Sequence, residues 1–164
     1  MTLLCPHPKQ KGERVEKYGD CIFMDLAGPL VPSYQDGARY LSLFVDQKTL
    51  HLGGYPIRYK SEQTYIHRKY VADHADIGAM NIRQFHSDNG GEFTGTEYIE
   101  QIRDSGAKKT TIVARAPNMN GVAEAAFWRI FTAVRAMLLD SGLPKYHWAA
   151  AARQAIWIFN RTPK

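Results

Sequence analysis

Cysteine is scarce in this sequence, and several other features are absent from it. Two cysteines, Cys5 and Cys21, occur among 164 residues, which is too few for a disulfide framework or a zinc site. No apolar run reaches the roughly 20 residues of a membrane span, and the N-terminus shows no signal-peptide pattern. Blocks of like charge, low-complexity tracts and internal repeats are also missing. We therefore expect an intracellular protein that does not cross a membrane, with Cys21 as a buried thiol in a strand.

The composition is that of one ordinary globular domain. Hydrophobic residues make up 45% and charged residues 23% of the chain, and this length can bury a sizeable core. Lysine and arginine total 21 against 16 aspartates and glutamates, which gives a net charge of +5. That balance is compatible with a polyanionic partner but does not establish one. We expect residues 1–19 to be a leader or linker remnant outside the core and residues 20–164 to form a single folded unit.

The apolar spacing predicts strands and helices in a definite order. Period-2 segments and short apolar runs predict five strands, at residues 20–27, 39–47, 50–57, 80–88 and 108–113. Helical spacing predicts four helices, at residues 60–75, 94–105, 121–140 and from about 143 onward. Three strands, a helix, a strand, a helix, a strand and two helices indicate an α/β layer fold. The expected architecture is a five-stranded mixed sheet flanked by helices.

Three acidic residues occupy positions from which they could meet. Asp25 lies inside the first expected strand within an apolar frame, Asp88 ends the fourth strand, and Glu124 lies in the first turn of the long helix. Each has an ordinary explanation on its own: a solvent-facing strand residue, a turn-initiating aspartate, or a glutamate at the positive end of a helix dipole. If the first and fourth strands are neighbours, the three carboxylates converge. Because clustered carboxylates repel one another, divalent cations are their usual partners.

Seven motifs occur in an order that points to one family. They are FMDLAGPL, GARYLSLFVD, YKSE, HSDNGGEF, NGVAE, VRAMLLDSGLP and FNRTP. Together they resemble the integrase catalytic core of copia-type retrotransposons with long terminal repeats, over nearly all of residues 18–164. The resemblance implies a ribonuclease-H-like fold and a D,D-35-E polynucleotidyl transferase, since 35 residues separate Asp88 from Glu124. It also implies that Asp25, Asp88 and Glu124 are catalytic and bind two Mg²⁺ ions, which Mn²⁺ can replace.

The implied activity is DNA integration. Attack by water on a DNA strand gives 3′-end processing, and attack by a DNA 3′-hydroxyl gives strand transfer; neither needs a covalent protein nucleophile. The implied partners are the retrotransposon ends, a target duplex and further copies of the chain in a homodimer or larger assembly. The implied location is a cytoplasmic virus-like particle and then the nucleus during integration.

Five residues near Glu124 are candidate DNA contacts. Arg115, Asn118 and Asn120 belong to the polar loop 114–120 that precedes Glu124, and Arg135 shares the Glu124 face of the long helix, where it could meet a phosphate. Trp128 also shares that face and could stack on an unpaired base; the alternative is a core or dimer-contact residue.

The sequence also departs from the family. Relatives usually follow the catalytic glutamate with basic and polar residues, whereas this chain has Ala125-Ala126-Phe127-Trp128. The zinc module and the C-terminal DNA-binding region of complete integrases are absent, so we expect a catalytic-core fragment or a shortened descendant.

Two alternatives stay open: a catalytically silent or host-adopted domain that binds DNA or protein, and a ribonuclease-H-type nuclease. The last two helices carry five aromatic residues, of which we expect a subset to line a homodimer contact away from the carboxylates, with Trp148 itself buried; they are Phe131, Tyr146, Trp148, Trp157 and Phe159.

Overall fold

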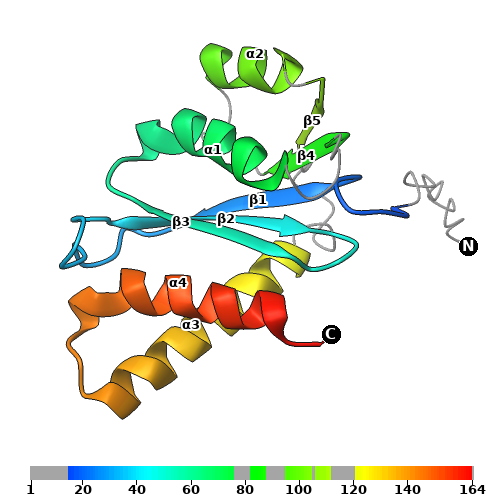
Figure 1. The fold of residues 1–164 in the computed structure, drawn as a ribbon. Helices are drawn as coiled ribbons and strands as arrows, with labels where there is room; N and C mark the ends of the chain where they lie inside the picture. Colours follow the sequence, from blue (N-terminus) through cyan, green and yellow to red (C-terminus); the bar gives the residue numbers. More distant parts are fainter. Residues whose placement is uncertain (1–14, 76–81, 88–94, 105, 112–120, 164) are drawn as a thin grey trace, which may run out of the picture.

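Five strands form one mixed sheet in the computed structural model, which describes residues 15–75, 82–87, 95–104, 106–111 and 121–163 (Figure 1). The strand order is β3-β2-β1-β4-β5, with β1 antiparallel to β2 and parallel to β4. The strands are β1 (Ile22–Ala27), β2 (Tyr40–Asp46), β3 (Leu52–Ile57), β4 (Gln84–Ser87) and β5 (Lys108–Thr111). The predicted five-stranded mixed sheet is confirmed, and so is the pairing of its first and fourth strands.

Helices cover both faces of the sheet. On one face lie α1 and α2, and on the other lie α3 and α4, so that the molecule has three layers (Figure 1). The helical segments are η1 (Lys60–Glu62), α1 (Gln63–Ala75), α2 (Thr96–Asp104), α3 (Gly121–Ser141), η4 (Lys145–His147) and α4 (Trp148–Arg161). In the parts of the chain that the structure describes, no helix has both the length and the apolarity to span a membrane.

The central strand β1 is buried from both sides. Its side chains alternate between the faces of the sheet. Ile22 and Met24 belong to the core under α1 and α2, whereas Phe23 belongs to the core against α3 and α4. Asp25 has the parity of Phe23 and therefore points toward α3. Cys21 is buried as a free thiol, as predicted, although it directly precedes β1 rather than lying in it.

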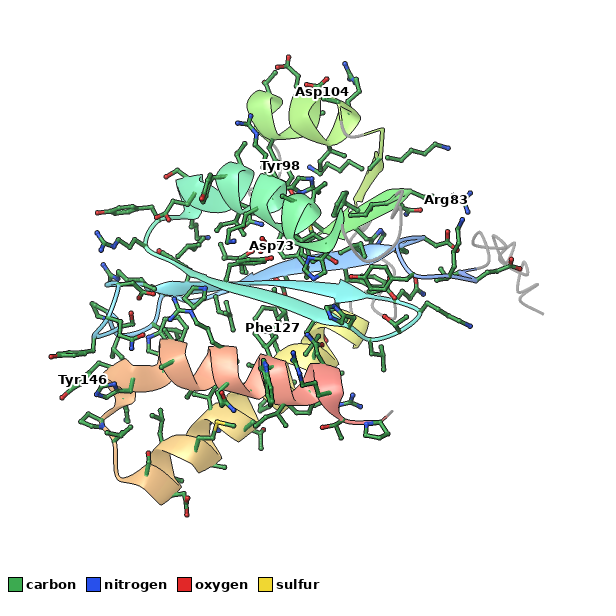
Figure 2. The ribbon with its side chains drawn as sticks, viewed as in Figure 1. Asp73, Arg83, Tyr98, Asp104, Phe127 and Tyr146 are labelled. Carbon is green, nitrogen blue, oxygen red and sulfur yellow. The ribbon has the colours of Figure 1, made fainter. Side chains whose placement is uncertain are left out.

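The α1 face carries more polar residues than the sequence pattern predicts. Helical spacing in the sequence predicts one apolar stripe along this helix, made of Tyr65, Ile66, Tyr70 and Val71, but the Tyr65 side chain is 64% exposed. Ile66 and Tyr70 of the predicted stripe are buried, and the polar residues Gln63, His67 and His74 are buried with them. The Tyr98 hydroxyl, from α2, lies 3.2 Å from His67 Nδ1. Figure 2 shows Tyr98 on this face of the sheet and Phe127 on the other.

Helix α4 is held at both of its ends, at its start to the segment after β1 and at its end to β3. At its start, the Trp148 indole N–H donates to the Val31 carbonyl at 2.8 Å, and Trp148 is buried as predicted. At its end, the Asn160 side-chain amide accepts from the Leu52 N–H and donates to the Leu52 carbonyl, both at 2.8 Å. Between them, a Cβ placed on Gly54 would lie 2.1 Å from Ile156 Cδ1. The absence of a side chain at Gly54 therefore sets how closely α4 approaches β3.

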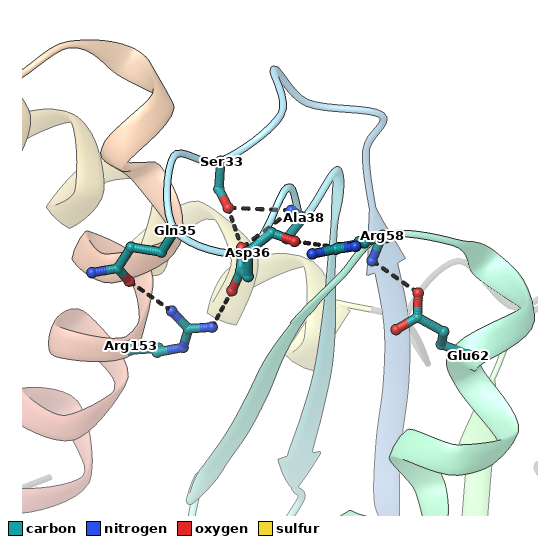
Figure 3. A network of polar contacts seen from close by, with 7 residues as sticks. All are labelled: Ser33, Gln35, Asp36, Ala38, Arg58, Glu62 and Arg153. Atoms are coloured by element: carbon teal, nitrogen blue, oxygen red, sulfur yellow. Dashed lines mark hydrogen bonds and ion pairs between the residues drawn. The ribbon is translucent and has the colours of Figure 1, made fainter.

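A polar network holds the segment that follows β1. Asp36 accepts from the Ser33 hydroxyl and the Ala38 N–H, and it forms an ion pair with Arg153 of α4 (Figure 3). The Arg58 guanidinium, at the end of β3, donates to the Asp36 carbonyl. The Ser33 and Arg153 bonds help to lower the pKa of Asp36, because both favour the ionised carboxylate. The chain after Asp25 is therefore fixed to both β3 and α4.

Candidate active site

Asp25 lies on the α3 face of the central strand. It is half-buried, its partner in the neighbouring strand is Leu43, and its Oδ1 accepts the Leu26 N–H at 2.8 Å. A carboxylate inside an apolar strand is costly to bury unless polar or ionic partners compensate. The half-exposed position of Asp25 leaves it within reach of such partners.

Glu124 lies in the first turn of α3 and is exposed. Its carboxylate is stabilised there by the positive end of the helix dipole. Four further side chains fall on the same side of α3 because their spacing of three or four residues matches the helical repeat. They are Phe127, Trp128, Phe131 and Arg135.

One cavity joins the two carboxylates to this helix face. It has a volume of about 310 Å³, and its lining residues are Asp25, Ala27, Glu124, Phe127, Trp128, Phe131 and Arg135. Strand parity explains the contribution of β1, since Asp25 and Ala27 both point toward α3. The structure therefore brings together four of the predicted site residues: Asp25, Glu124, Trp128 and Arg135. The other four, Asp88, Arg115, Asn118 and Asn120, lie outside the described residues.

Two of the three aromatic residues that line the cavity, Phe127 and Phe131, were not predicted as part of the site. Phe127 is 9% exposed and also belongs to the core, as its place on the apolar face of the helix predicts. Phe131 was one of five aromatic residues of which a subset was expected at a dimer contact away from the carboxylates; it lines the same cavity as Asp25 and therefore does not belong to that subset. The sequence signal that could have placed Phe131 in the site is its position seven residues after Glu124, because residues two helical turns apart share one face of a helix. Trp128 is 68% exposed, which excludes the core alternative for this side chain.

The carboxylates suit a hard divalent cation. Oxygen ligands from aspartate and glutamate, completed by water, are what Mg²⁺ prefers in proteins. Asp25 and Glu124 supply two such ligands to one cavity. Within the described ranges, no group of three or more histidine, cysteine, aspartate or glutamate side chains could hold a metal ion. The predicted third ligand, Asp88, lies beyond those ranges.

Comparison with known proteins gives relatives in plants. The chain is 31% identical over 144 residues to the Retrovirus-related Pol polyprotein from transposon TNT 1-94 of Nicotiana tabacum, a match that covers 88% of this chain and 11% of that protein. It is 32% identical over 145 residues to the corresponding polyprotein from transposon RE1 of Arabidopsis thaliana, over 87% of this chain and 10% of that protein. A third relative, from transposon RE2 of the same plant, is 30% identical over 131 residues, over 78% of this chain and 9% of its own length.

The chain is a copia-type Pol homologue. It spans about a tenth of the length of these polyproteins. No family model matches it.

Two solved structures share the fold of this copia-type Pol homologue. A chain of the simian T-cell lymphotropic virus intasome, solved in complex with PP2A regulatory subunit B56 gamma, matches with a TM-score of 0.71 and 16% identity, over 88% of this chain and 49% of that one. The HTLV-2 integrase catalytic core domain, solved as a dimeric form with magnesium, matches with a TM-score of 0.65 and 17% identity, over 89% of both chains. The fold is that of an integrase catalytic core, which is ribonuclease-H-like, as predicted.

Proposed function

We propose that this copia-type Pol homologue is the catalytic core of a retrotransposon integrase, a D,D-35-E polynucleotidyl transferase that performs 3′-end processing and strand transfer. The observation that carries the proposal is the shared cavity of Asp25 and Glu124. These residues come from β1 and α3, far apart in the chain. The relatives and the fold agree with this assignment.

Asp88 is the proposed third acidic residue. It follows Ser87 directly, and Ser87 ends β4, the strand that pairs with β1 beside Asp25. Its place in the sequence, directly after the strand that pairs with β1, is the reason for proposing Asp88.

Together, Asp25, Asp88 and Glu124 would hold two Mg²⁺ or Mn²⁺ ions. Once bound, the ions would supply Lewis-acid activation of the attacking hydroxyl and stabilisation of the leaving oxygen. The protein residues would hold the reacting phosphodiester in the cavity between β1 and α3.

The proposed partners are DNA and other copies of the chain. Both solved neighbours come from assemblies: one is part of an intasome and the other is a dimeric form. Tyr146 and Trp157, in η4 and α4, are 43% and 53% exposed, and they are candidates for a homodimer contact. We also propose that the protein resides in a cytoplasmic virus-like particle and acts in the nucleus during integration.

A catalytically silent binding domain is the second candidate. It is favoured by the residues after Glu124, where Ala125-Ala126-Phe127-Trp128 supplies no positive charge for phosphate contacts. The test that separates the two candidates measures nicking and joining of labelled duplex oligonucleotides, with several terminal sequences, in the presence and absence of a divalent metal. An integrase core nicks near the end and joins the new 3′-hydroxyl to a second duplex only when Mg²⁺ or Mn²⁺ is present. Binding without nicking or joining, under both metals, would favour the silent domain.

A further inference from the structure

Three aromatic side chains, Phe127, Trp128 and Phe131, line the cavity together with the two carboxylates and Arg135, and we call them the aromatic wall. We propose that this wall is a subsite for a single unpaired nucleotide of the DNA end, whose base stacks on Trp128 and whose phosphate meets Arg135. The inference rests on the proposed function, because it assigns part of the substrate to the same cavity. It explains why an aromatic residue, rather than a basic one, stands at position 128.

The geometry of α3 sets the order of the groups. Glu124, Trp128, Phe131 and Arg135 descend one side of the helix at intervals of three or four residues. Eleven residues separate the positions of Glu124 and Arg135, or roughly 16 Å at 1.5 Å per residue. Helical side chains lean toward the N-terminus of their helix, which directs Arg135 toward the aromatic wall. The cavity therefore presents an acidic end, an apolar middle and a cationic end.

The aromatic wall has one exposed ring and two sheltered ones. Trp128 is 68% exposed, whereas Phe127 is 9% exposed. The rings of Phe127 and Phe131 lie 6.0 Å apart with 13° between their planes, and both pack with the core. The sheltered pair fixes the floor of the cavity, and the indole of Trp128 is left available to a ligand. A nucleobase offers a π-face of any sequence to such a ring.

The size and charge of the cavity select a nucleotide among ligands. A volume of about 310 Å³ lies at the small end of the range of roughly 300–1,000 Å³ for ligand pockets, which suits one nucleotide and not a duplex. Arg135 is exposed, and its guanidinium can donate hydrogen bonds to a phosphate. A purely apolar ligand would leave that charge unused, and a second copy of the chain would cover Trp128 without needing Arg135.

The test compares two labelled duplexes that differ only at one end, which is blunt or carries a short single-stranded overhang with 2-aminopurine as its unpaired base. With Mg²⁺ present, the wild-type chain is expected to bind the overhang duplex about tenfold more tightly, the contribution of one stacked base, and to quench 2-aminopurine. Trp128→Ala should lose both the preference and the quenching, and Trp128→Phe should keep most of each. Arg135→Gln should lower the salt dependence of overhang binding by about one unit of slope.

Tyr65→Ala is the matched control. Tyr65 is 64% exposed, close to the exposure of Trp128, but it lies on α1 at the opposite face of the sheet. Its replacement should change nothing. The subsite is refuted if wild type shows no overhang preference, if Trp128→Ala weakens both duplexes equally, or if sedimentation shows that Trp128→Ala only dissociates a dimer. Failure of the proposed function is a separate result: a wild-type chain that neither nicks nor joins either duplex in Mg²⁺ or Mn²⁺.

Discussion

Asp25 and Glu124 line one cavity although 98 residues lie between them in the chain. Asp25 is placed by strand parity in β1, and Glu124 by the first turn of α3, which packs on the same face of the sheet. Two rigid elements thus hold the two carboxylates, and the site does not depend on a long loop to bring them together.

Replacing any proposed catalytic carboxylate should abolish the chemistry. We expect Asp25→Asn, Asp88→Asn and Glu124→Gln each to reduce nicking and strand joining to the background without enzyme. The far-ultraviolet circular dichroism of each variant should be unchanged, and its melting temperature without metal should be equal or higher, because like-charge repulsion is relieved. Asp104→Asn is the control, since Asp104 is an exposed aspartate of α2 on the other face of the sheet (Figure 2). Full strand transfer by any of the three variants would remove that residue from the site.

DNA should protect the segment just before α3. Arg115, Asn118 and Asn120 precede Glu124 closely in the sequence, and loop residues beside a rigid site commonly carry binding contacts. Hydrogen exchange measured by mass spectrometry should slow in residues 114–120 when duplex DNA is added. Equal protection with and without DNA would contradict a binding role for these three residues.

Stability should fall as the pH drops through the range in which histidines titrate. Burial lowers the pKa of His67 to about 4, against about 6.5 in an unfolded chain. Below pH 6.5 the unfolded state takes up a proton that folded His67 resists, so the free energy of unfolding decreases until the pH reaches about 4. The loss from this residue is about 3 kcal/mol at most.

Replacement of His67 isolates this effect. His67→Leu should flatten the pH dependence of urea unfolding between pH 6.5 and 4, even if the variant is less stable at neutral pH. Gly95→Ala, which changes no titratable group, is the control and should leave the slope unchanged. An unaltered slope in the His67 variant would show that other titratable groups determine how the free energy of unfolding depends on pH.

The contact between α4 and β3 depends on a missing side chain. Because a Cβ on Gly54 would lie 2.1 Å from Ile156 Cδ1, Gly54→Ala should lower the free energy of unfolding by about 1–3 kcal/mol. Adding Ile156→Val, which removes that methyl group, should recover part of the loss. Gly95→Ala is the control, since nothing lies within 4 Å of its added Cβ. If the changes in the free energy of unfolding caused by Gly54→Ala and Ile156→Val simply add in the double variant, as measured by urea titration, the two side chains do not clash directly.

Self-association should depend on the exposed aromatic residues of the last helix. Trp157 is 53% exposed, and strand transfer of two DNA ends calls for more than one copy of a core. Sedimentation at micromolar concentration should show a dimer that Trp157→Ala weakens. A strictly monomeric chain that still joins DNA ends would refute the proposed contact.

The order of strands and helices could be predicted from apolar runs and apolar periods, although α1 and β1 do not show a clear period. The two carboxylates Asp25 and Glu124 could be predicted from their motifs and their place in that order. The predicted stripe of α1 was wrong at Tyr65, since the polar residues Gln63 and His67 occupy the buried face and hide the helical period. The face of β1 that carries Asp25 could not be predicted, because this strand is buried on both sides and its pattern is the same for either face.

The Asn160 amide has a consequence for the outer rim of the sheet. β3 is the terminal strand on its side, and the N–H and carbonyl of Leu52 would otherwise be open to a strand from another molecule. The Asn160 side chain bonds both groups, so one amide imitates a single residue of a sixth strand. An aspartate cannot do this, because an ionised carboxylate has no N–H to donate. The last turn of α4 thus also protects the sheet from edge-to-edge aggregation.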